Sequence, residues 1–127
     1  LGAMMLHDPA AIDELAVDLT LAYGPRARSR VQHFVVPDHL LNAVRRISAP
    51  IDLIWGEHDA VHPDPEANAA VIRAFQPACE LRVIADAGHW PMYEQPARFE
   101  AALRDLLARP VRDRVDPAAL PQSAPAG

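Results

Sequence analysis

The spacing of apolar and polar residues changes twice along the chain. In residues 1–48 the apolar positions recur every three or four residues, as on one face of a helix. Asp8 as an N-cap, with Pro9 at the first helical position, predicts a helix that ends near Gly24. A second amphipathic piece has its apolar positions at Leu40, Leu41, Val44 and Ile47. We expect no strand in this part of the chain.

The pattern differs in residues 49–109. Two short runs of β-forming residues, 51–55 and 81–84, are each followed by a turn. Apolar positions at helical spacing return after each run, and the two helices begin at Asp64 and Gln95. This β-α-β-α order with short connections predicts parallel strands covered by helices, and therefore an α/β fold.

Two parallel strands do not form a stable sheet alone, since three or more strands with covered faces are normally needed. We therefore expect the chain to describe the end of a larger sheet. Either the earlier strands lie upstream in a longer protein, which is the simpler account, or a partner supplies them. Alone, the chain is expected to aggregate or to form a homo-oligomer through its exposed sheet edge.

The sequence thus divides into a helical segment at 1–48, the α/β part at 49–109 and a tail at 110–127. The tail holds prolines among Ala, Gly and Ser, a composition that predicts disorder.

Charge and composition narrow the class of partner. The net charge of -5 argues against nucleic acid and anionic membranes, which bind clustered Lys and Arg. The short cluster Arg26, Arg28 and Arg30 is interpreted as the solvated face of a third helix. One cysteine, Cys79, excludes an internal disulfide. With no apolar run long enough for a membrane span and no signal peptide, a cytoplasmic protein is expected.

The chemistry is expected in the loops 56–64 and 85–95, which follow the two strands. Parallel strands deliver such loops to the same edge of a sheet. If the strands are neighbours, Asp59 and His89 can approach each other. A carboxylate against an imidazole selects which ring nitrogen carries the proton and stabilises the imidazolium, so that the other nitrogen can act as a general base near neutral pH.

Three motifs in order carry a resemblance: Pro50-x-x-x-Ile54-Trp55-Gly56-x-x-Asp59, then Ala87-Gly88-His89-Trp90, then Glu94-x-Pro96-x-x-Phe99. Over residues 49–109 the chain is similar to the closing segment of α/β-hydrolases. The resemblance implies that Asp59 is the acid and His89 the base of a catalytic triad, in the chain order nucleophile, acid, histidine. It also implies that residues 1–48 are a helical lid, and it implies no organic cofactor and no metal.

The chain departs from the family pattern at the nucleophile. Its serines are Ser29, Ser48 and Ser123, and none lies in a Gly-x-Ser-x-Gly elbow. The elbow and the oxyanion-hole loop are therefore expected outside these residues. The Leu6-His7-Asp8 start and the Gly-His-Trp triplet resemble carbon–carbon bond hydrolases. However, Thr20 stands where those relatives carry a substrate-binding arginine, which leaves an esterase open.

Two functions follow as hypotheses. In the first, the parent protein hydrolyses a small apolar ester, or a carbon–carbon bond beside a ketone, through the triad. In the second, the chain is a non-catalytic, truncated hydrolase-like module that binds a small ligand or a partner chain.

Several residues keep two interpretations. Trp90 is either a wall of the substrate pocket or a core residue, and Val61 either lines that pocket or anchors its loop. Asp59 also suits a turn, and Glu94 suits the start of the last helix. A metal site would need the side chains of His58, Asp59, His62 and His89, but their loop lacks the helical spacing that holds paired histidines rigidly, and no metal is expected.

Overall fold

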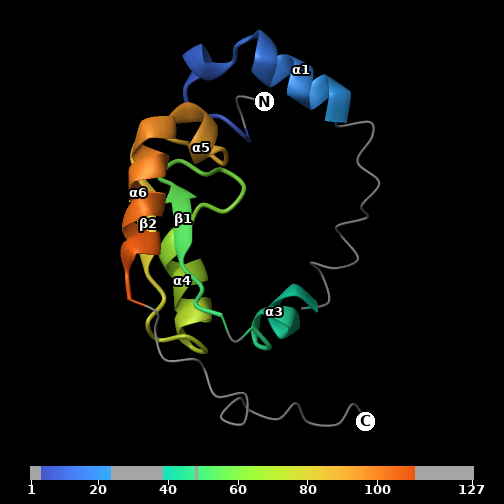
Figure 1. Ribbon diagram of the computed structural model, residues 1–127. Helices are drawn as coiled ribbons and strands as arrows, with labels where there is room; N and C mark the ends of the chain where they lie inside the picture. Colours follow the sequence, from blue (N-terminus) through green and yellow to red (C-terminus); the bar gives the residue numbers. More distant parts are fainter. Residues whose placement is uncertain (1–3, 24–38, 48, 111–127) are drawn as a thin grey trace.

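The computed structural model describes residues 4–23, 39–47 and 49–110 (Figure 1). Its elements in chain order are η1 (Pro9–Ala11), α1 (Glu14–Tyr23), α3 (His39–Val44), β1 (Leu53–Gly56), α4 (Pro65–Arg73), β2 (Leu81–Ile84), α5 (Pro91–Glu94) and α6 (Pro96–Ala108). No helix among these residues is both long and apolar enough to cross a lipid bilayer. The predicted arginine-rich helix and the predicted tail after residue 110 lie outside the described residues.

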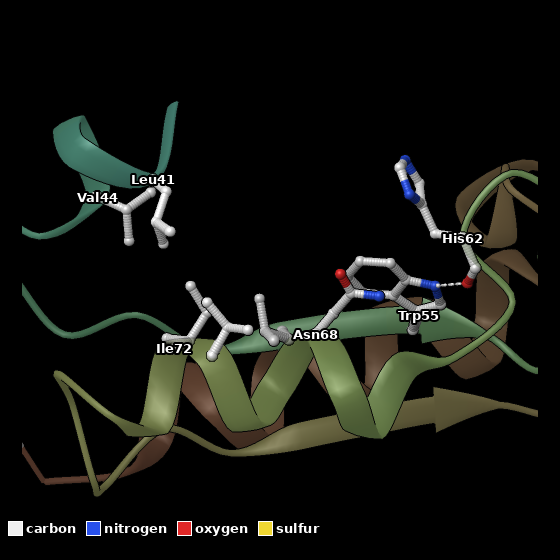
Figure 2. Close-up of a pocket in the computed structure, with 8 residues that line it drawn as sticks. Leu41, Val44, Trp55, His62, Asn68 and Ile72 are labelled. Carbon is white, nitrogen blue, oxygen red and sulfur yellow. Dashed lines mark hydrogen bonds between the residues drawn. The ribbon is translucent and has the colours of Figure 1, made fainter. Parts of the chain in front are cut away.

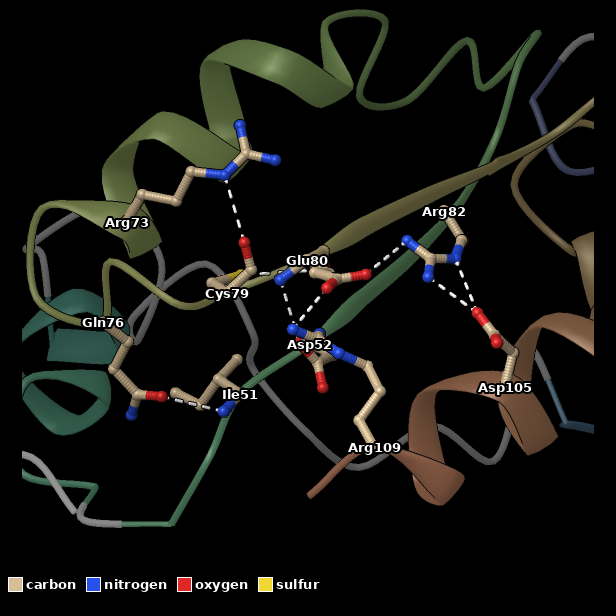
Figure 3. A network of polar contacts seen from close by, with 9 residues as sticks. All are labelled: Ile51, Asp52, Arg73, Gln76, Cys79, Glu80, Arg82, Asp105 and Arg109. Carbon is tan, nitrogen blue, oxygen red and sulfur yellow. Dashed lines mark hydrogen bonds and ion pairs between the residues drawn. The ribbon is translucent and has the colours of Figure 1, made fainter. Parts of the chain in front are cut away.

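The two strands form the centre of the α/β part. β1 and β2 pair directly and in parallel, with a register that runs from Leu53 opposite Leu81 to Gly56 opposite Ile84. α4 packs against β2, and α6 packs against both strands, on the other side of the pair (Figures 1 and 3). The predicted α/β architecture with neighbouring parallel strands is confirmed.

Local sequence signals set the helix ends. Asp64 caps α4 by accepting a hydrogen bond from the Ala67 amide, and Pro65 occupies the first turn. α6 likewise begins at Pro96. β2 and both of these helices therefore agree with the prediction. α5 was not predicted, although Pro91 at its start is the usual signal.

The first helix begins later than predicted. Asp8 does act as an N-cap, but it caps the short 3-10 helix η1 through the Ala10 amide. α1 starts again at Glu14, after Asp13 accepts a hydrogen bond from the Ala16 amide at 2.9 Å. Asp13 thus caps a new helix at the point where the first turn would otherwise continue. The one predicted helix is therefore divided into η1 and α1.

The start of β1 also differs from the prediction, because the amide of Ile51 is used elsewhere. It donates to Oε1 of the buried Gln76 at 2.8 Å, while Nε2 of Gln76 donates to the carbonyls of Ile47 and Ala49 at 3.2 and 2.9 Å. Regular pairing begins at Leu53. The side chain of Gln76 therefore holds in place the segment that leads into β1.

A polar network surrounds the beginning of the strands, at the end away from the strand-end loops (Figure 3). Asp52 accepts from the Glu80 amide at 2.9 Å, and Arg109 at the end of α6 pairs with both carboxylates. Arg82 pairs with Glu80 at 2.6 Å and with Asp105 of α6 at 2.7 Å. These contacts connect the two strands and α6.

Candidate active site

The structure brings the two predicted catalytic side chains together. Gly56 and Ile84 end their strands opposite each other, so both following loops leave the sheet at one edge. Nδ1 of His89 lies 2.9 Å from Oδ2 of Asp59. A neutral imidazole at this distance donates its Nδ1 proton to the carboxylate, which makes Nε2 the nitrogen available to accept another proton.

Asp59 uses its two oxygens for different partners. Oδ2 faces His89, whereas Oδ1 accepts from the amides of Val61 and His62 at 2.8 and 3.0 Å. Oδ1 therefore makes the contacts of a turn residue, while Oδ2 has the position that the acid interpretation requires; the catalytic role of Asp59 stays a prediction. The carboxylate is 5% exposed, and this burial raises the pKa of Asp59. The hydrogen bonds from His89 and the two amides outweigh burial, so its pKa lies below the ordinary 3.8.

Backbone hydrogen bonds extend the pairing of the strands into the loops. The amide of Glu57 donates to the carbonyl of Ile84 at 3.0 Å, and the amide of His58 donates to that of Ala87 at 2.8 Å. The loop that carries Asp59 is thereby fixed to the loop that carries His89.

A cavity of about 270 Å³ lies beside the pair, and its lining residues are Ile54, Trp55, Gly56, Asp59, His62, His89 and Pro91. A larger, mostly apolar cavity of about 390 Å³ shares Trp55 and His62 with it and continues between α3 and α4 (Figure 2). Nε1 of Trp55 donates to the carbonyl of His62 at 3.0 Å. The ring of His62 lies 5.7 Å from that of His89, centroid to centroid.

The sequence interpretation missed Trp55 and His62 as cavity residues. Trp55 was recognised as part of a motif, and its position directly before the turn was an available signal. Nothing in the local sequence distinguishes His62 from a solvated loop residue.

The two predicted substrate contacts lie elsewhere around the site. Neither Trp90 nor Val61 is among the lining residues of these two cavities. Trp90 is half-buried, its ring lies 6.3 Å from that of Tyr93, and its amide donates to the carbonyl of Met5 at 3.0 Å. Val61 contributes its amide to Asp59. A role for either side chain in binding substrate stays a prediction.

The histidines considered for a metal site have other neighbours. The ring of His58 stacks on His7, with centroids 3.8 Å apart. Within the described residues, the His and acid atoms close enough to share an ion belong to Glu57, His58 and Asp86, all exposed and within 4.8 Å of one another. Arg98 already pairs with Asp86 at 3.2 Å. We assign no metal to this group.

Comparison with known proteins identifies the family of the chain. A model described as the alpha/beta hydrolase family matches residues 2–102 of the chain. The protein belongs to the alpha/beta hydrolase family. No solved structure matches the chain significantly.

Two of the proteins that the chain is similar to come from mycobacteria. It is 35% identical over 75 residues to uncharacterized protein Rv2715 of Mycobacterium tuberculosis (strain ATCC 25618 / H37Rv). It is equally similar to uncharacterized protein Mb2734 of Mycobacterium bovis (strain ATCC BAA-935 / AF2122/97). The match covers 59% of this chain and 20% of each relative, so the chain matches about a fifth of the relatives' length.

Proposed function

We propose that this chain supplies the acid, the base and part of the substrate cavity of a hydrolase that cleaves small apolar esters or a carbon–carbon bond beside a ketone. The observation that carries the proposal is the 2.9 Å contact between Nδ1 of His89 and the buried carboxylate of Asp59. The nucleophile belongs to a segment outside this chain, either upstream in a longer protein or in a partner.

In the ester reaction, Nε2 of His89 accepts the proton of the nucleophile's hydroxyl as its oxygen attacks the substrate carbonyl. The resulting imidazolium is stabilised by Asp59, whose lowered pKa keeps it ionised at neutral pH. His89 then gives its proton to the leaving alkoxide. A water molecule, activated by the same nitrogen, hydrolyses the acyl-enzyme and restores the nucleophile.

The cavities support a small apolar substrate. The larger one is lined mainly by aliphatic side chains of α3, β1 and α4, and it meets the smaller one at Trp55 and His62 (Figure 2). An apolar group held there would place its reacting carbon toward His89. This arrangement fits an aliphatic or aromatic acyl group better than a charged one, since burial of an unpaired charge is costly.

The test uses a form of the protein extended to include the preceding coding sequence. Reading that sequence comes first: a continuous frame with further strands and a Gly-x-Ser-x-Gly elbow supports the proposal. Turnover of p-nitrophenyl esters and of a dienone-type substrate is then measured. His89→Ala is expected to abolish most activity, and wild-type rates in this variant contradict the assignment.

A second candidate function is favoured by the absence of an elbow from the sequence. In this alternative the chain is a non-catalytic module that binds a small ligand or a partner chain. A stop codon just before Met4, together with ligand binding that is insensitive to substitution of His89, would support the module over the hydrolase.

A further inference from the structure

Glu94, the last residue of α5, binds three backbone amides with one carboxylate. Oε1 accepts from the amides of His7 and Asp8 at 2.6 and 2.8 Å, and Oε2 accepts from the amide of Gly88 at 2.5 Å. The first two donors are 87 and 86 positions away in the sequence, whereas Gly88 directly precedes the histidine of the candidate site. One side chain thus joins the N-terminal segment to the loop that carries the base.

Other contacts bring the same two parts of the chain together. The hydroxyl of Tyr93 donates to Asp13 at 2.5 Å, and this bond lowers the pKa of Asp13. The amide of Trp90 donates to the carbonyl of Met5 at 3.0 Å. The N-terminal segment in blue therefore lies against α5 in Figure 1. Within this group, Glu94 is the residue whose side chain binds the amide of Gly88, directly before His89.

The contacts of Glu94 differ from those of a helix cap. The residue before α6 is Gln95, which makes no side-chain cap hydrogen bond, and α5 starts three residues before Glu94. All three partners of Glu94 are donors outside both helices. A carboxylate can accept all of them, and charge-assisted hydrogen bonds are roughly twice as strong as neutral ones. A carboxamide of the same size would place its own donor against at least one of these amides.

We propose that Glu94 is a positioning residue for His89. Its carboxylate fixes the amide of Gly88, and this sets the direction from which the imidazole reaches Asp59. Because the same carboxylate also binds the amides of His7 and Asp8, it connects the residues before η1 to the loop that carries His89. A displacement of these N-terminal residues would therefore change the orientation of His89 without direct contact with its ring. This inference rests on the proposed function, in which His89 is the base.

The test compares Glu94→Gln with Glu100→Gln in the form of the protein that is extended to include the preceding coding sequence. Glu100 is an exposed glutamate of α6 that pairs with Arg104, so its variant loses the same charge far from these amides. Two quantities are measured by NMR. One is hydrogen exchange at the amides of His7, Asp8 and Gly88, and the other is the nitrogen chemical shifts of the His89 ring, which report which nitrogen carries the proton.

For Glu94→Gln, exchange at the three amides should rise roughly tenfold or more, and His89 should lose its preference for a proton on Nδ1. Glu100→Gln should change neither quantity. If exchange rises while the His89 nitrogens keep the pattern of the unmodified chain, Glu94 is only a structural contact and the proposal is overturned.

Glu94→Asp keeps the test decisive if the Gln variant does not fold. Its carboxylate keeps the charge but is one methylene shorter, so it cannot hold all three amides, and an intermediate change in both quantities is expected. Unchanged His89 nitrogens in this variant also overturn the proposal. Neither quantity needs turnover: full activity of a His89→Ala enzyme would refute the proposed function and leave these NMR results as they are.

Discussion

The last residue of β1, Gly56, lies directly against the backbone of Gly88. A Cβ atom built on Gly56 would stand 1.9 Å from the carbonyl oxygen of Gly88 and 2.6 Å from that of Ala87. The glycines of the two sequence motifs therefore meet in space, and the absence of a side chain lets the two loops approach closely enough for Asp59 to reach His89.

This contact predicts that Gly56→Ala is strongly destabilising. The added methyl group overlaps backbone rather than a flexible side chain, so we expect a loss of about 3 kcal/mol in the free energy of unfolding. Urea denaturation measures the change. Ala60→Ser, at an exposed position of the same loop, should stay within about 0.5 kcal/mol of the unmodified protein. Equal stability of the two variants would contradict the close approach.

Asp59→Asn is expected to lower kcat by on the order of 10⁴-fold in a form of the protein that carries the nucleophile. An amide can offer His89 a donor instead of an acceptor, and it cannot stabilise the imidazolium. Steady-state hydrolysis of a p-nitrophenyl ester checks this. Asp64→Asn is the matched control, because Asn also caps helices and Asp64 serves α4. A comparable loss of kcat in both variants would speak against a special role for Asp59.

The lowered pKa of Asp59 makes a prediction about stability in acid. The unfolded chain binds this proton more tightly than the folded one, so the contribution is fully present above the ordinary pKa of 3.8. It is lost as the pH falls through the lower, folded-state pKa. Unfolding free energies at about pH 6 and about pH 3 should therefore differ less in Asp59→Asn than in the unmodified protein. The same pH dependence in both would remove Asp59 as its source.

Gln76→Leu should cost about 2 kcal/mol of stability, because one amide and two carbonyls near the start of β1 lose their partner. The same substitution at Gln95 removes one exposed hydrogen bond, to the carbonyl of Asp86, and should cost about 0.5 kcal/mol. Urea midpoints of the two variants give the comparison. A smaller loss of stability at Gln76 than at Gln95 would show that the Gln76 side chain does not hold the segment before β1 in place.

We also expect residues 1–127 alone to self-associate. Within the described residues β1 pairs only with β2, so its other edge offers unpaired backbone groups to a second strand. Sedimentation velocity at increasing concentration should show dimers or larger species. A single monomeric boundary at every concentration would mean that this edge is covered.

The sequence predicted those parts of the fold whose signals are local. β2, α4 and α6 follow from β-forming runs, prolines and helical spacing. The rule that parallel strands end at one edge predicted the meeting of Asp59 with His89 only on the condition that the strands are neighbours, and the structure supplies that condition. Contacts between distant segments could not be predicted in this way. Glu94 was interpreted by its distance from the next helix, whereas two of its three partners, the amides of His7 and Asp8, lie near the start of the chain. The start of α1 was missed because two aspartates compete to cap adjacent turns.

The parallel register of β1 and β2 sets the spacing of Asp59 and His89. A slip of one residue would carry the histidine loop about 3.3 Å along the neighbouring strand and turn alternate side chains to the opposite face. The 2.9 Å bond could not survive such a shift. Substitutions among Asp52, Glu80 and Arg109, at the far end of the strands, are therefore able to separate Asp59 from His89 while both side chains remain chemically intact.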